Sequence, residues 1–257
     1  MTVPALFRGL FDDAAVFPPG DLPLAEAVPA HLGHRSAWYA DAVGPFLCGA
    51  GRAGELAAPA VPGLRVGLVL PGGSDRPGPV PLHGLDVVGV ELVGTEVPAG
   101  LPEGVTVSLE LPRDELLVKR LDRLAGTPHR AKFRTGGLTA DAFPTEAELA
   151  ALLTACAERG VPYKCTAGLH NALRHTDPVT GFEHHGFLNV LLAAADPSRA
   201  AEALAERSGP VVAAAVRALT DAQVATARAS FTAFGTCSIA EPLADLAALD
   251  LMSQENR

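Results

Sequence analysis

Two stretches of the sequence carry the strongest fold signal: RAKFRTGGL at residues 130–138 and VPYKCTAGLH at residues 161–170. Each is a short β-rich run that leads into a glycine-containing turn. Side chains alternate between the two faces of a strand, so Lys132 and Arg134 share one face and apolar residues occupy the other. An apolar face suits packing against helices, whereas an outward Lys-x-Arg pair would have to cross that buried layer. We therefore expect Lys132, Arg134 and Lys164 to point into the interior of a closed sheet.

The rest of the chain repeats this rhythm, because short β-rich runs alternate with alanine-rich helical stretches. Such alternation predicts βαβ units and a parallel sheet. Eight strands are expected, at 14–17, 44–48, 64–70, 86–93, 105–111, 130–134, 162–166 and 230–234. Eight strands in 257 residues predict an α/β fold, a single (β/α)8 barrel of the TIM type covering residues 1–257.

Helices are expected within 22–39, where Pro29 should break or start the helix, and at 114–124, 145–159, 200–207, 220–229 and 241–251. The helix at 145–159 has the clearest signals, because Thr145 and Glu148 form a capping box and Gly160 follows the last turn. The connections at 71–85 and 94–104 show no helical pattern, which predicts irregular connections. Residues 174–189, RHTDPVTGFEHHGFLN, are interpreted as a histidine-rich inserted loop that enters a helix near Phe187.

The composition of the chain argues against some classes of function. A formal net charge of -9 argues against a general nucleic-acid binder and against attraction to an anionic membrane. A local group of cations can still bind a small anion. The four cysteines are widely spaced and form no C-x-x-C pair, which is typical of free thiols in a reducing cytosol. Neither a signal peptide nor a membrane-spanning run is recognised, so a cytoplasmic location is expected.

The candidate functional residues lie where the predicted strands end, which is where barrels of this type carry their active sites. Lys132 and Lys164 should be neighbours, since adjacent strands lie just under ~5 Å apart. Two ammonium groups that close lower each other's pKa, and a lysine with a depressed pKa can attack a carbonyl to form a Schiff base. Glu91 and Glu110 are isolated acids in apolar strands and need buried partners, for which Lys132, Arg134 and Lys164 are the candidates.

Three short motifs carry a family resemblance: AKFRTGG at 131–137, KCTAGLH at 164–170 and AFGTCSI at 233–239. They resemble the last three strands of deoxyribose-phosphate aldolase, a class I aldolase. The resemblance implies that Lys132 forms the Schiff base, that Lys164 tunes it and that Glu91 assists proton transfer. It places a phosphate near Gly168 and the turn Gly235-Thr236-Cys237-Ser238. The chain departs from the family pattern at Arg134, in the Ala-Gly-Leu-His turn after Lys164, and in the long segment 174–189.

We therefore expect a class I aldolase-type lyase that acts on a small anionic carbonyl compound and needs no cofactor. The expected catalytic residues are Lys132, Lys164, Glu91 and Glu110. The expected substrate-binding residues are Arg134, Gly168, His170, Gly235, Thr236, Cys237, Ser238 and Asp13. The alanine-rich outer helices leave room for a homo-oligomer interface.

Two other functions stay open. In a metal-dependent lyase or isomerase, carboxylates among Asp12, Asp13, Glu91 and Glu110 would hold Mg²⁺ and the lysines would stabilise an enolate. A zinc site formed by His170, His175, Glu183, His184 and His185 would lack the usual spacing. In a non-enzymatic anion-binding barrel, the lysines would only neutralise the buried acids.

Overall fold

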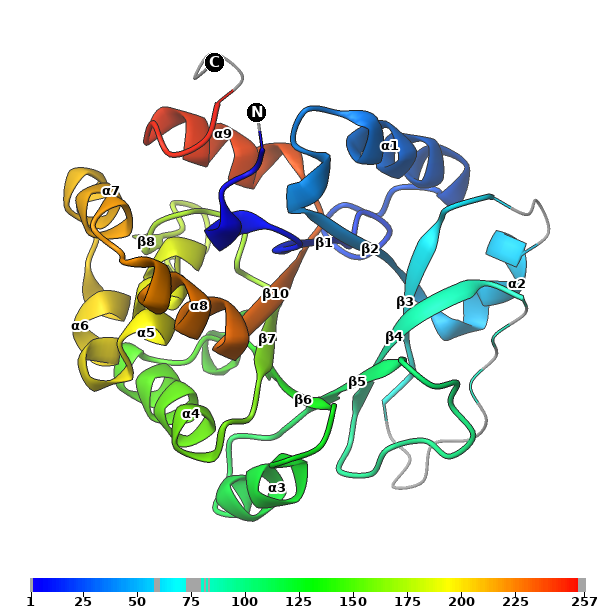
Figure 1. The fold of residues 1–257 in the computed structure, drawn as a ribbon, viewed down its shortest axis with the longest axis horizontal. Helices are drawn as coiled ribbons and strands as arrows, with labels where there is room; N and C mark the ends of the chain where they lie inside the picture. Colours follow the sequence, from blue (N-terminus) through cyan, green and yellow to red (C-terminus); the bar gives the residue numbers. More distant parts are fainter. Residues whose placement is uncertain (1, 58–60, 73–79, 81, 83, 254–257) are drawn as a thin grey trace.

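Eight parallel strands pair into a closed ring in the computed structural model, in the order β1-β10-β7-β6-β5-β4-β3-β2 (Figure 1). The structure describes residues 2–57, 61–72, 80, 82 and 84–253. The ring strands are β1 Phe11–Asp13, β2 Val43–Gly49, β3 Arg65–Val69, β4 Asp86–Val93, β5 Thr106–Glu110, β6 Arg130–Arg134, β7 Tyr163–Thr166 and β10 Phe231–Thr236. The predicted TIM-type α/β barrel is confirmed, and 86–93 and 130–134 keep their predicted bounds.

The first strand lies upstream of its predicted position. Residues 14–17 form a turn, in which the Phe17 amide donates to the Ala14 carbonyl over 2.8 Å. The strand itself is Phe11–Asp13, whose residues pair in order with Phe234, Gly235 and Thr236 of β10. The prediction of a strand at 14–17 is therefore wrong, and the two aspartates lie inside the first strand.

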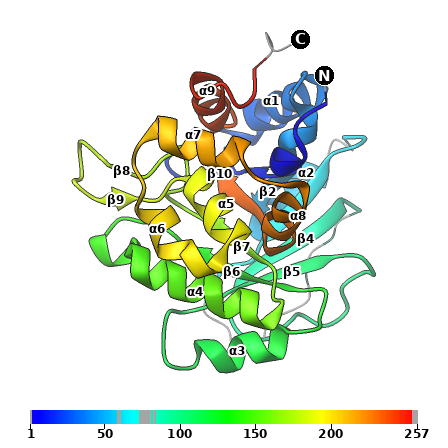
Figure 2. The same cartoon turned by 60° about the vertical axis from the view of Figure 1, so that its left-hand side comes forward.

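Helices surround the ring (Figures 1 and 2). They are α1 Leu24–Ser36, α2 Ala53–Ala57, α3 Leu117–Leu124, α4 Glu146–Arg159, α5 Phe187–Ala195, α6 Ala200–Ala205, α7 Gly209–Arg217, α8 Asp221–Ser230 and α9 Ala240–Ala248. The capping box of Thr145 and Glu148 and the left-handed Gly160 bound α4 as predicted. Helix α1 continues through Pro29, so the expected break is wrong. Helices α2 and α7 were not predicted. Of the helices described, none combines the length and apolar character needed to span a bilayer.

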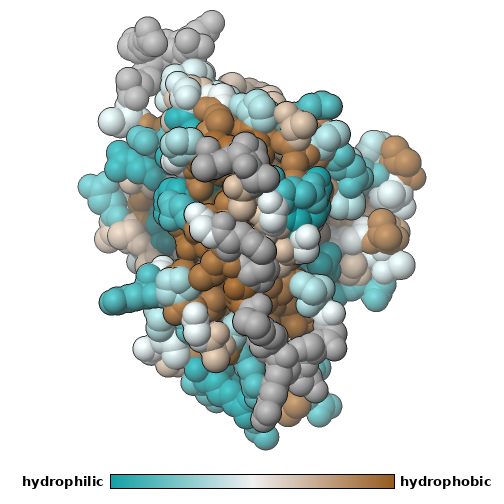
Figure 3. Space-filling model, turned by 90° about the vertical axis from the view of Figure 1, so that its right-hand side faces the viewer, coloured by the Kyte–Doolittle hydropathy of each residue, from teal (hydrophilic) through white to brown (hydrophobic). Residues whose placement is uncertain are grey.

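The connections are irregular on one side of the barrel. Residues 94–104, between β4 and β5, contain no helix, as predicted. The prediction for 71–85 lies largely outside the described residues. Figure 3 faces this side of the molecule, and apolar side chains gather at its centre. The outward side chains of β3 and β4, such as Leu68 and Val90, are fully buried nonetheless.

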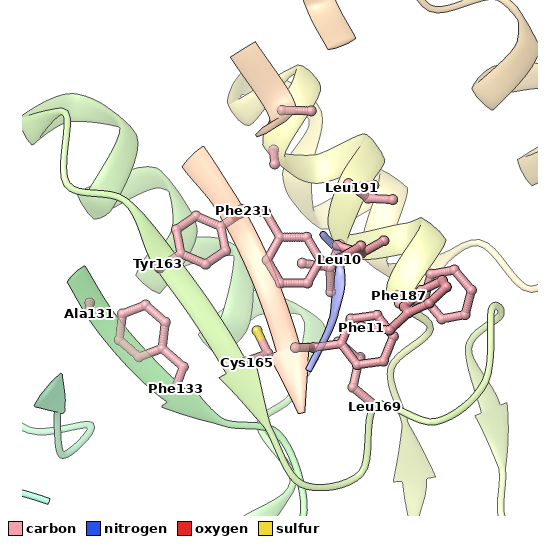
Figure 4. Close-up of a cluster of buried hydrophobic side chains, with 14 of the residues drawn as sticks. Leu10, Phe11, Ala131, Phe133, Tyr163, Cys165, Leu169, Phe187, Leu191 and Phe231 are labelled. Atoms are coloured by element: carbon pink, nitrogen blue, oxygen red, sulfur yellow. The ribbon is translucent and has the colours of Figure 1, made fainter. Parts of the chain in front are cut away.

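The opposite side of the barrel carries an aromatic core between the strands and α5 (Figure 4). Phe187 of α5 stacks on Phe234 of β10 with ring centroids 5.2 Å apart. Phe133 and Tyr163 lie in the same outer layer, with ring centroids 6.1 Å apart. Because the residues alternate along β6 and β7, this outward packing turns the neighbouring Lys132 and Lys164 into the barrel.

The histidine-rich segment is a small hairpin rather than a loop. Strands β8 His175–Thr176 and β9 Glu183–His184 pair antiparallel, and the hairpin projects from the barrel in Figure 2. The Asp177 side chain accepts the amides of Val179 and Thr180 over 3.0 and 2.7 Å, which closes the turn. The predicted loop 174–189 is thus corrected to a hairpin that leads into α5 at Phe187, where a helix was expected.

Candidate active site

Six charged side chains form one continuous network inside the barrel, in which negative and positive groups alternate. In order along the network they are Asp12, Lys164, Glu91, Lys132, Glu110 and Arg134. Lys164 Nζ pairs with Asp12 Oδ2 at 2.5 Å and with Glu91 Oε1. Lys132 Nζ lies 2.8 Å from Glu91 Oε2 and 3.0 Å from Glu110 Oε2. Arg134 is the last member of the network, and its Nε lies 2.9 Å from Glu110 Oε1. The two lysines therefore share one carboxylate, that of Glu91.

Strand register explains this convergence. Lys132 pairs with Lys164 across β6 and β7, and Glu110 pairs with Lys132 across β5 and β6. Glu91 reaches the same level from β4, and Lys132 and Lys164 are only 4 % and 2 % exposed. A buried charge is tolerated when it is paired, and all these charges are. The predicted convergence of both lysines, Glu91, Glu110 and Arg134 is confirmed in position.

The lysine content of the chain makes this placement unusual. The sequence contains three lysines. Lys119 is exposed on α3, whereas the other two lie side by side in the interior. Lysine is rarely buried without a structural or chemical role. Most of the lysine in this protein is thus committed to one site.

The protonation states follow from the pairing. Burial alone would raise the pKa of Glu91, but Lys164 and Lys132 outweigh it and lower that pKa to about 2. The pKa of Glu110 is lowered in the same way by Lys132 and Arg134 against the effect of burial. Both glutamates are therefore ionised at neutral pH.

Lys164 behaves differently from the sequence-based expectation. Burial would lower its pKa, but Asp12 and Glu91 outweigh burial and raise the pKa above the usual value. The expectation that Lys132 depresses the pKa of Lys164 is thus wrong, because two carboxylates face that ammonium. Burial also raises the pKa of Asp12, which shares its single lysine with Glu91. Lys164 is therefore held in its charged form by these two carboxylates.

Asp13 does not join the network. Its carboxylate points to the helix side, where Oδ2 lies 2.9 Å from Nδ1 of His31 on α1. The inward residue is its neighbour Asp12, which the sequence analysis named only among the possible Mg²⁺ ligands and not among the expected catalytic or substrate-binding residues. Consecutive residues of a strand face opposite sides, so only one of the two aspartates can enter the barrel. The predicted substrate-binding role of Asp13 is replaced by a structural one, anchoring α1.

A second polar group gathers where β7 and β10 end. His170 Nδ1 lies 3.4 Å from Thr236 Oγ1, 3.6 Å from Cys237 Sγ and 3.2 Å from Glu241 Oε2. Burial and Glu241 raise the pKa of Cys237, so this residue is a neutral thiol. The structure thus brings together three of the predicted substrate-binding residues and adds Glu241, which the sequence analysis did not single out.

The remaining predicted positions form the turns around this group. Ser238 lies just before α9, and its Oγ accepts the amide of Glu241 over 3.3 Å. Gly168 has a φ of +71° and packs against Gly136, where a Cβ on Gly168 would lie 3.0 Å from the Gly136 Cα. Gly235 pairs with Asp12 in the ring. These residues shape the backbone at the C-terminal ends of the strands.

The expected metal alternatives find little support in the arrangement of donors. Asp12, Glu91 and Glu110 already hold ammonium groups, so a cation would have to displace lysines. His185 contacts the Pro144 carbonyl at 2.7 Å, and His184 contacts the Gly168 carbonyl at 3.2 Å. Within the described part of the chain, no group of three or more His, Cys, Asp or Glu residues is arranged to hold a metal ion.

Gly44 of β2 gives a direct test of the network's packing. A Cβ at this position would lie 2.1 Å from Asp12 Oδ1. We expect Gly44→Ala to push Asp12 away from Lys164 and to lower the free energy of unfolding by about 1–3 kcal/mol. Gly49→Ala, on the same strand, meets no atom within 4 Å and should be nearly neutral. Denaturant unfolding of both variants makes the comparison; equal effects would mean that Gly44 makes no specific room for Asp12.

Comparison of the chain with protein-family models, with curated protein sequences and with solved structures returned no match. The fold and the site together define a closed parallel α/β barrel with a charged interior. One fold of this kind carries many functions, so the function depends on the groups in the site.

Proposed function

We propose that this protein is a lyase of the class I aldolase type, acting through a Schiff base on Lys132 with a small anionic carbonyl compound. The observation that carries the proposal is the pair of adjacent buried lysines joined by the Glu91 carboxylate. Imine chemistry is favoured by a desolvated lysine next to another cationic group, and Lys132 is buried beside Lys164.

The charge balance of the network suits this chemistry. The neutral amine of Lys132 attacks the carbonyl carbon, a C–N bond forms, and loss of water leaves a protonated imine. That iminium carries one positive charge, as the Lys132 ammonium did, so Glu91 and Glu110 face a cation on Lys132 both before the attack and after the imine has formed. A carboxylate takes the proton of the hydroxyl group on the departing carbon, that oxygen forms a carbonyl as the C–C bond breaks, and the electron pair of the bond moves onto the iminium to give an enamine. Protonation of the enamine carbon and hydrolysis then release the second product and free Lys132. The carboxylates of Glu91 and Glu110 lie within 3.0 Å of Lys132 Nζ and are positioned to take and return its proton.

The two lysines have different surroundings, which favours Lys132 as the nucleophile. Lys132 is linked through Glu110 to Arg134, whose side chain is 50 % exposed at the end of β6. Lys164 is linked instead to the buried Asp12. A substrate that enters past the end of β6 meets the Arg134 guanidinium first, which can bind a phosphate or carboxylate through two parallel hydrogen bonds. Lys164, held charged, then supplies positive charge beside the reacting nitrogen.

The experiment is reductive trapping. The protein is incubated with acetaldehyde, pyruvate or dihydroxyacetone phosphate, treated with borohydride, and digested for peptide mass spectrometry. Borohydride reduces an imine to a stable secondary amine, so the proposal predicts a substrate-dependent mass increase on the Lys132 peptide. Lys119 is the internal control for nonspecific reaction. If none of the carbonyl compounds modifies Lys132 above the level seen at Lys119, the Schiff-base route is wrong.

One alternative is favoured by a specific observation. Each charged group of the network has at least one partner of opposite sign, which a purely structural ion-pair network inside an anion-binding barrel would also require. That alternative predicts no trapped adduct at either buried lysine, together with anion binding that depends on Arg134. The trapping experiment and an anion titration of Arg134→Ala therefore separate the two functions.

A further inference from the structure

A cavity of about 510 Å³ occupies the other end of the barrel interior. Its outer lining comes from residues at or near the starts of strands, among them Val43, Arg65, Thr106 and Arg130. Its inner end reaches Asp12, Glu91 and Lys164 of the charged network. Small-molecule sites occupy ~300–1,000 Å³, so the volume suits a ligand. Barrel active sites usually lie at the opposite, C-terminal end of the strands, so this cavity is a separate feature.

Glycines at inward positions of neighbouring strands form part of the cavity wall. Gly44, Gly67 and Gly89 line it, on β2, β3 and β4, together with Ser108 of β5. Barrel interiors of this type are ordinarily filled by layers of branched side chains. A Cβ on Gly89 would meet only the Thr106 carbonyl, at 3.6 Å, so the space beside Gly89 is open. Beside Gly44 and Gly67 the space is taken by Asp12 and Leu47, so the open part of the cavity lies beside Gly89.

The outer lining is cationic. Arg35, Arg65 and Arg130 contribute three guanidinium groups against one carboxylate, that of Asp41. Arg35 donates to the backbone carbonyls of Ala40 and Val43 over 2.6 and 2.8 Å, which gives it a structural role. Among the described residues, Arg130 makes one side-chain hydrogen bond, 2.9 Å from Nη1 to Thr232 Oγ1. Arg65 has neither an ion pair nor a side-chain hydrogen bond with any residue that the structure describes. Arg65 and Arg130 therefore keep donor capacity for a ligand.

We propose that this cavity binds a small hydroxylated oxyanion. The oxyanion, a phosphate or a carboxylate, pairs with Arg65 and Arg130 at the mouth. Hydroxyl groups on the rest of the ligand face Ser108 and Thr106 along the wall and the carboxylate of Asp12 at the inner end. The ligand is thus anchored at the opposite end of the barrel from Arg134. This inference concerns binding only and holds whether or not Lys132 forms an imine.

The test is a titration with glycerol 3-phosphate, glycerate and glycerol, followed through the backbone amide signals of Gly67 and Gly89 by NMR. Both oxyanions should shift these signals saturably, and uncharged glycerol should not. The ratio of the two affinities identifies phosphate or carboxylate as the preferred group. In Arg65→Ala/Arg130→Gln, the affinity should fall about tenfold or more, because charge-assisted hydrogen bonds are lost. Arg134→Ala should leave the shifts of Gly67 and Gly89 unchanged.

Gly89→Leu tests the cavity independently of its charge. The leucine side chain would fill the open space beside Gly89 and should abolish the shifts of Gly67. If Gly89→Leu does not fold, the arginine variant alone decides. The proposal is overturned if the oxyanions leave Gly67 and Gly89 unshifted, or if the shifts persist at the same affinity in the arginine variant.

Discussion

Replacing Lys132 by arginine should abolish the borohydride-trapped adduct and reduce turnover of the adduct-forming carbonyl compound on the order of a thousandfold or more. Arginine keeps the positive charge that Glu91 and Glu110 need, at the position where Lys132 Nζ lies 2.8 and 3.0 Å from their oxygens. A guanidinium stays protonated and does not act as a nucleophile at neutral pH. The variant therefore removes the chemistry and keeps the charge of the network.

Two matched variants serve as controls for Lys132→Arg. Lys164→Arg should retain the adduct on Lys132 but slow its formation, because the cation beside the reacting nitrogen is displaced. Lys119→Arg, at an exposed position of α3, should behave like the unchanged protein. The measurements are the mass of the Lys132 peptide and the single-turnover rate of each variant. An adduct that persists on Lys164 in Lys132→Arg would reverse the proposed roles of the two lysines.

The barrel could be predicted because its signal is local. In β6, polar and apolar residues alternate, so the inward direction of Lys132 and Arg134 followed from the pattern alone. The pairing of Glu91 and Glu110 with those cations followed from the cost of burying an unpaired carboxylate. Both inferences needed only the strand positions and the assumption that the sheet closes.

The first strand is a case in which a local sequence pattern does not predict which side chain faces the barrel interior. In Phe11–Asp13 two aspartates stand next to each other, so alternation does not say which of them faces the interior. Only the register with β10, in which Asp12 pairs with Gly235, settles that choice. The direction of the Lys164 pKa shift has the same origin. Two adjacent lysines predict a depressed pKa, but Asp12 and Glu91 come from strands far apart in sequence and reverse the sign.

The cavity at the starts of the strands could not be predicted from the sequence either. Gly44, Gly67 and Gly89 are separated by more than twenty residues along the chain, and each one alone is an ordinary glycine in a strand. Ring closure places them on adjacent strands that face the interior together, with Gly67 paired to Gly89. The open space beside Gly89 is therefore a property of the closed ring and not of any one segment.

Replacing Glu91 by glutamine should lower the free energy of unfolding at neutral pH by about 3 kcal/mol. Glu91 holds both lysines, and without its charge the interior keeps three cations against the two carboxylates of Asp12 and Glu110. The matched control is Glu55→Gln, which removes an exposed partner 3.2 Å from Arg52 and should cost less than about 1 kcal/mol. Urea unfolding of the two variants measures the contrast, and similar losses in both would show that the buried network adds no stability.

The same variant predicts a pH dependence of defined sign. The pKa of Glu91 is about 2 in the folded protein against 4.5 when unperturbed. As the pH falls from 4.5 towards 2, the unfolded chain therefore binds a proton before the folded protein does, and stability is lost. Glu110 acts in the same direction and Asp12 in the opposite one, but both are present in the unchanged protein and in Glu91→Gln. The difference in unfolding free energy between these two proteins should consequently be constant above pH 4.5 and shrink as the pH falls towards 2. A difference that stays constant across that range would mean that Glu91 does not carry the charge on which both lysines depend.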